Sequence, residues 1–192
     1  MKRIFSALFS ALIFVACESE YTKLVRSELA RNITMDSLVF NVRFGDTKKE
    51  FYDHCWQLNK KGLITNGPKN AMVQYIFIDS IFHREPTSIR FLFYGDFDET
   101  GRIKGMDCEF GYPGWSPWNT RYSADSLQSK VVRIVQKWYG GNQFIKVHFD
   151  DTQNLWVKVD GNRRIVVKKI NQQDVSMSIH NLLHDDYKHS NL

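Results

Sequence analysis

The stretch "SIRFLFYGDFDETGRIKGMDCEFGY", residues 88–112, decides the fold of this chain. Its two ends are strand-like runs, and Met106, Cys108 and Phe110 alternate with polar residues, as in a half-buried strand. Between the runs lies "DETG", where Asp98 and Gly101 favour a tight turn. The stretch therefore predicts an antiparallel hairpin.

A helix and more strands are expected before this hairpin. Residues 38–44 alternate apolar and polar side chains, and residues 71–82 are strand-like, so both predict strands. Between them, Thr47 and Glu50 have the spacing of a capping box, and apolar residues then recur at helical intervals. Residues 47–62 are therefore expected to form an amphipathic helix.

The same order recurs after the hairpin. Ser123 can cap a helix whose apolar residues share one face, and the Gly140-Gly141 pair would end it. Three strand-like runs follow, with the hairpin signal Asp160-Gly161 between the last two. Residues 175–183 fit either a fourth strand or a short helix.

These patterns predict an α+β protein made of two tandem helix-plus-antiparallel-sheet repeats. The repeats would span residues 38–112 and 122–183, with a Pro/Gly/Trp-rich linker at 113–121 and a polar tail at 184–192. The sequence leaves open whether the two sheets merge into one.

The first residues have the layout of a secretory signal. Lys2 and Arg3 precede a largely apolar region of 13 residues, which is shorter than the approximately 20 residues of a membrane-spanning helix. Residues 1–16 are expected to be removed, and residues 17–37 are expected to form a tether, with a short helix as the alternative for 18–32.

The end of this segment, "FVAC" at residues 14–17, resembles the lipobox of bacterial lipoproteins, with Phe14 where leucine is usual. The resemblance implies that Cys17 carries a diacylglyceryl group and becomes the amino terminus. Two or more acyl chains anchor a protein stably, so the chain is expected in the bacterial cell envelope as an outer-membrane lipoprotein, periplasmic or surface-exposed. Glu18 and Glu20 around Ser19 are similar to the surface-export tag of Bacteroidetes-like lipoproteins, and an acidic flexible tether is the alternative.

The stretch "FNVRFGDTKKEFYDHCWQLNKKGLI", residues 40–64, followed by aromatic-rich strands, resembles small uncharacterised lipoproteins of Bacteroidetes. The tandem plan is also similar to the beta-lactamase-inhibitor-protein fold. That likeness implies an architecture but no contact residues, because fold alone does not determine function.

Charge and cysteine content limit the partners. The formal charge is +5, of which Lys2 and Arg3 would leave with the signal, and so mild an excess predicts no nucleic-acid partner. With Cys17 lipidated, Cys55 and Cys108 remain, and the predicted helix and strand turn both of them toward the protein interior. The cell envelope is an oxidising compartment, in which disulfides can form. They are candidates for a disulfide, with two separate buried thiols as the alternative.

A weak metal-site candidate lies in "DFDETGRIKGMD", residues 96–107. Asp96, Asp98, Thr100 and Asp107 fall on ligand positions of a calcium loop, but the flanks are strand-like and a hairpin turn explains the same residues. His180 and His184 could share a helix face, although a polar chain end explains them equally well. We expect no resident metal or other cofactor.

Aromatic residues provide the remaining binding signal. Tyr112, Trp115 and Trp118 lie beside two prolines in a predicted surface connection, where they could stack on glycan rings or fill the seam between the repeats. No nucleophile–base motif appears, so an enzyme is not expected. The leading expectation is a lipid-anchored envelope binding or scaffold protein with a protein partner; the alternatives are a carbohydrate-binding accessory lipoprotein and, behind it, an envelope hydrolase.

Overall fold

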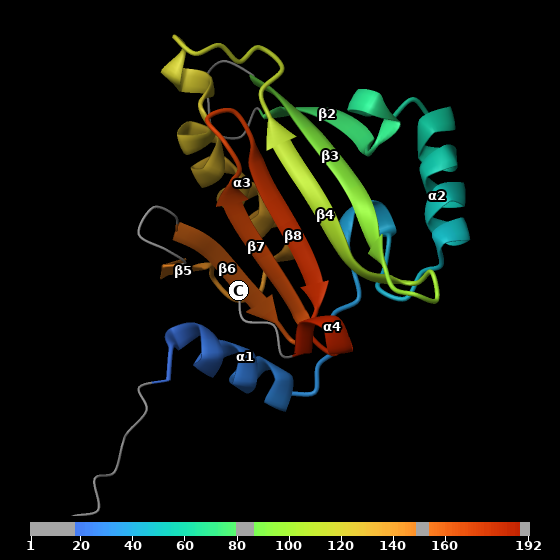
Figure 1. The fold of residues 1–192 in the computed structure, drawn as a ribbon, viewed down its shortest axis with the longest axis vertical. Helices are drawn as coiled ribbons and strands as arrows, with labels where there is room; N and C mark the ends of the chain where they lie inside the picture. Colours follow the sequence, from blue (N-terminus) through green and yellow to red (C-terminus); the bar gives the residue numbers. More distant parts are fainter. Residues whose placement is uncertain (1–17, 80–86, 149–153, 189–192) are drawn as a thin grey trace, which may run out of the picture.

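The computed structural model describes residues 18–79, 87–148 and 154–188, and Figure 1 shows their arrangement. The strands form one eight-stranded sheet in which all neighbouring strands pair antiparallel, in the order β1-β2-β3-β4-β8-β7-β6-β5. The α+β class is therefore confirmed, and the two predicted sheets are merged.

The helices are α1 (Glu20–Ala30), α2 (Lys48–Lys60), α3 (Ala124–Tyr139) and α4 (Asp185–Lys188). The strands are β1 (Thr65–Asn66), β2 (Val73–Asp79), β3 (Thr87–Phe97), β4 (Ile103–Gly111), β5 (Ile145–His148), β6 (Asn154–Asp160), β7 (Arg163–Lys169) and β8 (Val175–Asn181).

The predicted hairpin of residues 88–112 is β3 and β4. The Asp98 carboxylate accepts hydrogen bonds from the Thr100 and Arg102 backbone N–H groups at 2.8 and 3.0 Å, which fixes the turn. Gly101 follows with φ +78°, a conformation that glycine adopts without steric cost. The hairpin lies in the middle of the sheet because β4 pairs with β8 on its other side. Residues 175–181 are thus a strand, which decides between the two alternatives.

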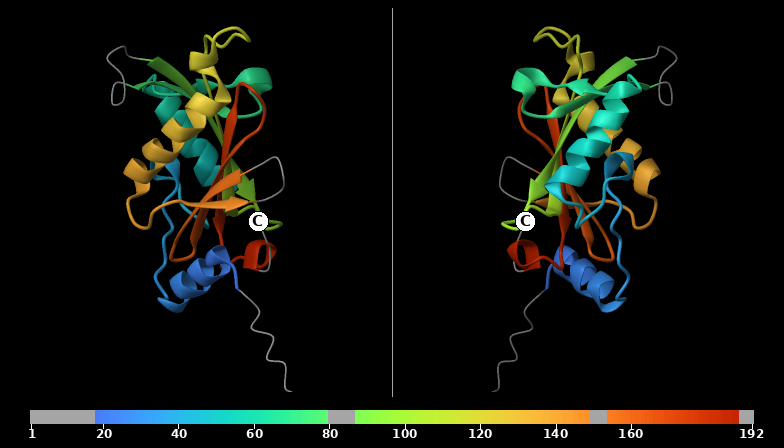
Figure 2. Two further views of the ribbon diagram at one scale, coloured as in Figure 1. Left: turned by 90° about the vertical axis from the view of Figure 1, so that its left-hand side faces the viewer. Right: turned by 90° about the vertical axis from the view of Figure 1, so that its right-hand side faces the viewer.

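Both predicted amphipathic helices cover one face of the sheet, as Figure 2 shows. Thr47 and Glu50 form the expected capping box of α2, and the Ser123 hydroxyl caps α3. Phe51 of α2 is 1% exposed and packs against Phe93 of β3, while α3 packs on β4, β7 and β8. The main core lies between these two helices and the sheet.

Residues 17–37 were expected to be a tether, with a short helix as the alternative for 18–32, and the structure has the helix α1 there. The Ser19 hydroxyl caps this helix, and its apolar residues pack against Leu155, Val157 and Val159 of β6. These three residues alternate along β6 with Trp156, which packs against the main core, so α1 covers the opposite face of the sheet. A second apolar cluster on that face explains why the polar-looking segment folds.

Residues 38–44 do not form the predicted strand. Leu38 and Val42 are joined by a backbone hydrogen bond of 2.8 Å around a short 3₁₀ turn, Val39–Asn41, in which Phe40 and Asn41 have positive φ angles. The turn buries Leu38, Val39 and Val42 together, so consecutive residues point inward where a strand would alternate. The apolar residues of 38–44 are therefore buried as expected, but the backbone that buries them is a turn and not a strand.

The Asp160-Gly161 turn between β6 and β7 encloses charged groups. Lys158 is 0% exposed, and its Nζ lies 2.9 and 3.0 Å from the two Asp160 carboxylate oxygens. Asp160 Oδ1 also accepts the Asn142 backbone N–H at 2.8 Å. Burial lowers the pKa of Lys158 despite this pairing.

The same turn fastens the amino-terminal segment to the sheet. Glu28 of α1 accepts the Gly161 N–H at 2.8 Å and is held by Arg31. Asn162 Oδ1 accepts the Met35 N–H at 2.6 Å, and Arg163 Nη1 donates to the Ser37 carbonyl at 2.9 Å. The hairpin signal is therefore confirmed, and its turn also joins residues 28–37 to the second half of the chain.

Candidate functional site

The predicted aromatic cluster does not assemble. Tyr112 is 1% exposed and packs against Tyr122 in the core, Trp115 is half-buried, and Trp118 is 85% exposed. Tyr112 therefore belongs to the core, which corrects its assignment to a ligand site. The strand β4 ends at Gly111, and the alternating pattern still directs the next residue inward.

The calcium-loop candidate is a hairpin. Asp98 is occupied by its own turn, Asp96 accepts a hydrogen bond from the Tyr187 hydroxyl, and Asp107 lies farther along β4 opposite Ser178. Within residues 18–79, 87–148 and 154–188, no group of three or more His, Cys, Asp or Glu side chains could hold a metal ion. Antiparallel strands separate these carboxylates, whereas a calcium loop would wrap them around one point.

Cys55 and Cys108, the cysteines among the described residues, are free thiols. Cys55 lies on α2, and Cys108 lies on β4 beneath the helices, with 3% of its surface exposed. Burial raises the pKa of Cys55 to about 11 and raises that of Cys108 as well, so both stay protonated at neutral pH. The structure therefore has two separate buried thiols, and Cys55 and Cys108 are not joined in a disulfide. Cys17 lies outside the described residues.

The start of the predicted polar tail is folded against the sheet. His180 of β8 stacks on Tyr187 of α4 with ring centroids 4.3 Å apart, and Arg164 donates to its Nδ1 at 3.1 Å. Lys104 of β4 pairs with Asp186. His180 and His184 are thus on a strand and in a turn, and they do not share a helix face.

His180 should make the fold sensitive to acid. Burial, then Arg164 and Lys104, lower its pKa from 6.5 to about 4, so between these values the unfolded chain binds a proton that the folded chain excludes. The free energy of unfolding should therefore fall as the pH drops through this window, by up to about 3 kcal/mol from this group. Urea unfolding at about pH 7 and about pH 4.5 should show a smaller difference in His180→Gln than in the unaltered protein. Equal pH dependence in the two proteins would contradict the prediction.

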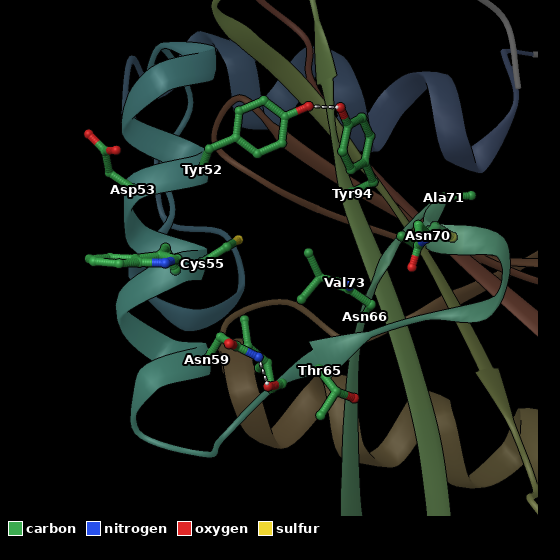
Figure 3. Close-up of a pocket in the computed structure, with 13 residues that line it drawn as sticks. Tyr52, Asp53, Cys55, Asn59, Thr65, Asn66, Asn70, Ala71, Val73 and Tyr94 are labelled. Atoms are coloured by element: carbon green, nitrogen blue, oxygen red, sulfur yellow. Dashed lines mark hydrogen bonds between the residues drawn. The ribbon is translucent and has the colours of Figure 1, made fainter.

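A groove beside α2 is the strongest candidate binding site, and Figure 3 shows it. It encloses about 720 Å³ between α2, the β1 segment and the start of β2. On the helix, Tyr52, Cys55, Trp56 and Asn59 follow one another at i, i+3, i+4 and i+7, so they share one face. Phe51 is buried beneath the helix and holds this face in position.

Polar residues of a turn form the opposite wall. Thr65 and Asn66 of β1 are exposed there. Asn70, the last residue of the 3₁₀ turn Pro68–Asn70, is also exposed, and its φ angle is +56°. Ile64 and Val73 line the floor. The wall opposite the helix is therefore polar, while the helix contributes two aromatic rings together with the polar groups of Asp53 and Asn59.

The rings at the rim remain available to solvent. Trp56 is 56% and Tyr52 47% exposed, although both lie on a well-formed helix. Lys60 Nζ lies 3.4 Å from the Trp56 ring centroid and steadies the indole through a cation–π contact. The Tyr52 and Tyr94 hydroxyls meet at 2.6 Å across the end of the groove (Figure 3).

The groove contains no activated nucleophile among the residues that line it. The hydrogen bond to Tyr52 and burial raise the pKa of Tyr94 to about 12, so its phenol stays neutral, as does the Cys55 thiol whose sulfur points into the groove (Figure 3). The lining thus combines hydroxyls, amides and aromatic faces with one carboxylate, that of Asp53, and such groups can bind polar molecules.

Sequence reasoning placed the binding aromatics elsewhere. The helix over 47–62 was predicted, and the exposed Trp56 and Tyr52 next to its buried stripe were the signal that could have indicated this groove. The wall of β1 and its turn could not be anticipated, because it depends on how residues 64–73 return toward α2.

The comparisons identify no relative: no family model matches the chain, and no curated protein and no solved structure does. Among the described residues, no helix has the length and apolar character needed to cross a membrane.

Proposed function

We propose that this protein is a non-catalytic binding protein of the bacterial cell envelope, anchored through a lipidated Cys17, and that it holds a saccharide in the groove beside α2. The observation that carries the proposal is the pairing of two exposed aromatic rings, Tyr52 and Trp56, with the polar wall of Thr65, Asn66 and Asn70. Sugars present an apolar face of C–H groups and an edge of hydroxyls, so they match both walls.

The rigidity of the site supports this proposal. Trp56 and Tyr52 lie on a capped helix, and each ring offers a large contact area with few rotatable bonds. A preorganised site loses less conformational entropy on binding. An anchor at the envelope would place such a groove where polysaccharides are abundant.

We also propose that the chain contains two related α+β units. Each half supplies a helix followed by four strands, α2 with β1–β4 and α3 with β5–β8, and the halves meet where β4 pairs with β8. The strand order is symmetric about this junction, which is what a tandem pair of units facing each other would produce.

Replacing Trp56 by alanine should abolish most saccharide binding. The mature protein would be applied to an array of bacterial and plant oligosaccharides, and the affinity for any retained glycan compared by calorimetry. We expect Trp56→Ala to weaken binding about tenfold or more, because the ring supplies a large share of the contact area. Trp118→Ala removes a tryptophan that is 85% exposed and does not line the groove, and it should bind normally. If no glycan on the array binds, or if Trp56→Ala and Trp118→Ala lose affinity equally, the proposal of a saccharide ligand is rejected.

A protein partner is the second candidate, favoured by β2. Ile76 and Ile78 are 52% and 65% exposed on this strand, and among the described residues β1 covers its edge only at Val73 and Gln74. Strands with an open edge can accept another chain. Such a partner would still bind the Trp56→Ala variant, which separates the two candidates.

A further inference from the structure

Two tyrosines close one end of the groove beside α2. The Tyr52 and Tyr94 hydroxyl oxygens lie 2.6 Å apart, so one phenol donates to the other and the pair bridges α2 and β3 (Figure 3). Tyr94 is held in this position because its ring contacts those of Phe51 and Phe97, with centroids 5.6 and 5.8 Å away. The pair therefore forms a fixed wall across this end of the groove.

Asn59 closes the other end. Its side-chain nitrogen donates to the Ile64 carbonyl oxygen at 2.8 Å, which joins the end of α2 to the residue just before β1 (Figure 3). Asn59 follows Tyr52 by seven residues, so the two closures lie about 10 Å apart along the helix axis. The groove is therefore a short trough, bounded at both ends by described residues and open to solvent at its rim, where Trp56 is exposed.

Both closures leave polar groups that a sugar can use. A hydrogen bond between two phenols uses one hydroxyl hydrogen, and within the described residues the Tyr52–Tyr94 pair makes no other, so its second hydrogen is left for a ligand. Asn59 gives an amide hydrogen to Ile64 and keeps its side-chain oxygen as an acceptor. The terminal unit of a glycan has a free hydroxyl group where an internal unit has a glycosidic bond. Closed ends that carry donors and acceptors match the terminal unit.

We infer that the groove recognises the terminal unit of a glycan chain or branch, and that the Tyr52–Tyr94 pair binds a hydroxyl group that only this unit has free. The inference rests on the proposed saccharide function and narrows its class of ligand. An internal unit has a neighbour on each side, and these neighbours would collide with the tyrosine pair or with the Asn59 contact. A terminal unit has one neighbour, which can leave through the open rim beside Trp56.

Partial hydrolysis of polysaccharides tests this inference, because it multiplies chain ends while the mass of sugar stays constant. Dextran, xylan, mannan and galactan would each be titrated into the mature protein by calorimetry, as intact polymers and as partial acid hydrolysates of equal mass. For any polymer that binds, we expect the number of binding sites per gram to increase by the same factor as the measured number of reducing ends. Recognition of internal units would instead leave the number of sites per gram unchanged.

A variant without the two hydroxyls tests the role of the pair. Tyr52→Phe/Tyr94→Phe keeps both rings, and it should weaken binding of the hydrolysates about tenfold, as expected for the loss of one hydrogen bond to the ligand. Tyr122→Phe removes a hydroxyl from a tyrosine that does not line the groove, so it should bind normally. Thermal unfolding would check that the double variant is folded.

The possible failures are distinguishable. If the number of sites per gram is the same before and after hydrolysis, or if the double variant binds the hydrolysates as tightly as the unaltered protein, the inference is overturned and the saccharide proposal stands. If no polysaccharide binds in either form, both are rejected.

Discussion

Asp160→Ala is expected to destabilise the protein by about 3–5 kcal/mol, the largest effect of any single charge removal proposed for this chain. Lys158 is 0% exposed, and without Asp160 its ammonium group would be buried with no opposite charge at 2.9 Å. The Asn142 N–H would also lose its acceptor. Thermal unfolding should show a decrease in Tm of roughly 10 °C.

A surface ion pair provides the control. Asp53 lies 2.5 Å from Lys49 on α2, but both side chains are largely exposed, so Asp53→Ala should leave the Tm nearly unchanged. The double variant Lys158→Met/Asp160→Asn removes both charges and should recover part of the loss. If Asp160→Ala unfolds at the same temperature as Asp53→Ala, the buried pair does not stabilise this fold.

Phe51→Ala is expected to cost about 3–5 kcal/mol and to loosen the saccharide groove as well. Phe51 is 1% exposed and contacts the rings of Phe93, Tyr94 and Phe97, so its removal leaves a cavity between α2 and β3. Since the next residue is Tyr52 and Trp56 lies just over one turn away, both would lose their fixed position. Denaturant unfolding measures the first effect, and amide hydrogen exchange of α2 measures the second.

Phe51→Leu is the matched control for this prediction. Leucine refills part of the space, so it should cost less than half as much and keep the exchange of α2 slow. A loss of under about 1 kcal/mol for Phe51→Ala would mean that other contacts hold α2 on the sheet, since deletion of a buried phenylalanine normally exceeds this value.

The local elements were largely predictable. The capping box at Thr47 and Glu50, the hydroxyl cap at Ser123 and the Asp160-Gly161 turn each depend on residues only a few positions apart. Short stretches of sequence therefore determine the geometry of these elements. For residues 18–32 the sequence left a tether and a short helix open, and contacts more than one hundred positions away, such as Gly161 with Glu28, hold α1 on the sheet. The turn at residues 38–44 was not predicted, because its form depends on contacts with other elements, such as those of Phe40 with His54 and Tyr75.

The candidate site was predicted less well than the fold. The sequence directed attention to Tyr112, Trp115 and Trp118, whereas the structure buries Tyr112 and places Tyr52 and Trp56 in a groove with the polar wall formed by residues 65–70. Proximity of aromatic residues along the chain indicates a binding surface only if the backbone turns all of them outward, and β4 turns Tyr112 inward.

By itself, the sequence determined the α+β class, the positions of α2 and α3, and the two hairpins, because periodicity and capping act within a few residues. Only the tertiary structure decided that β4 pairs with β8 to merge the sheet, that α1 covers its second face, and that a groove forms between α2 and the β1 segment. Strand pairing and cavity walls join residues far apart in the chain, and their energies depend on burial that no local pattern specifies.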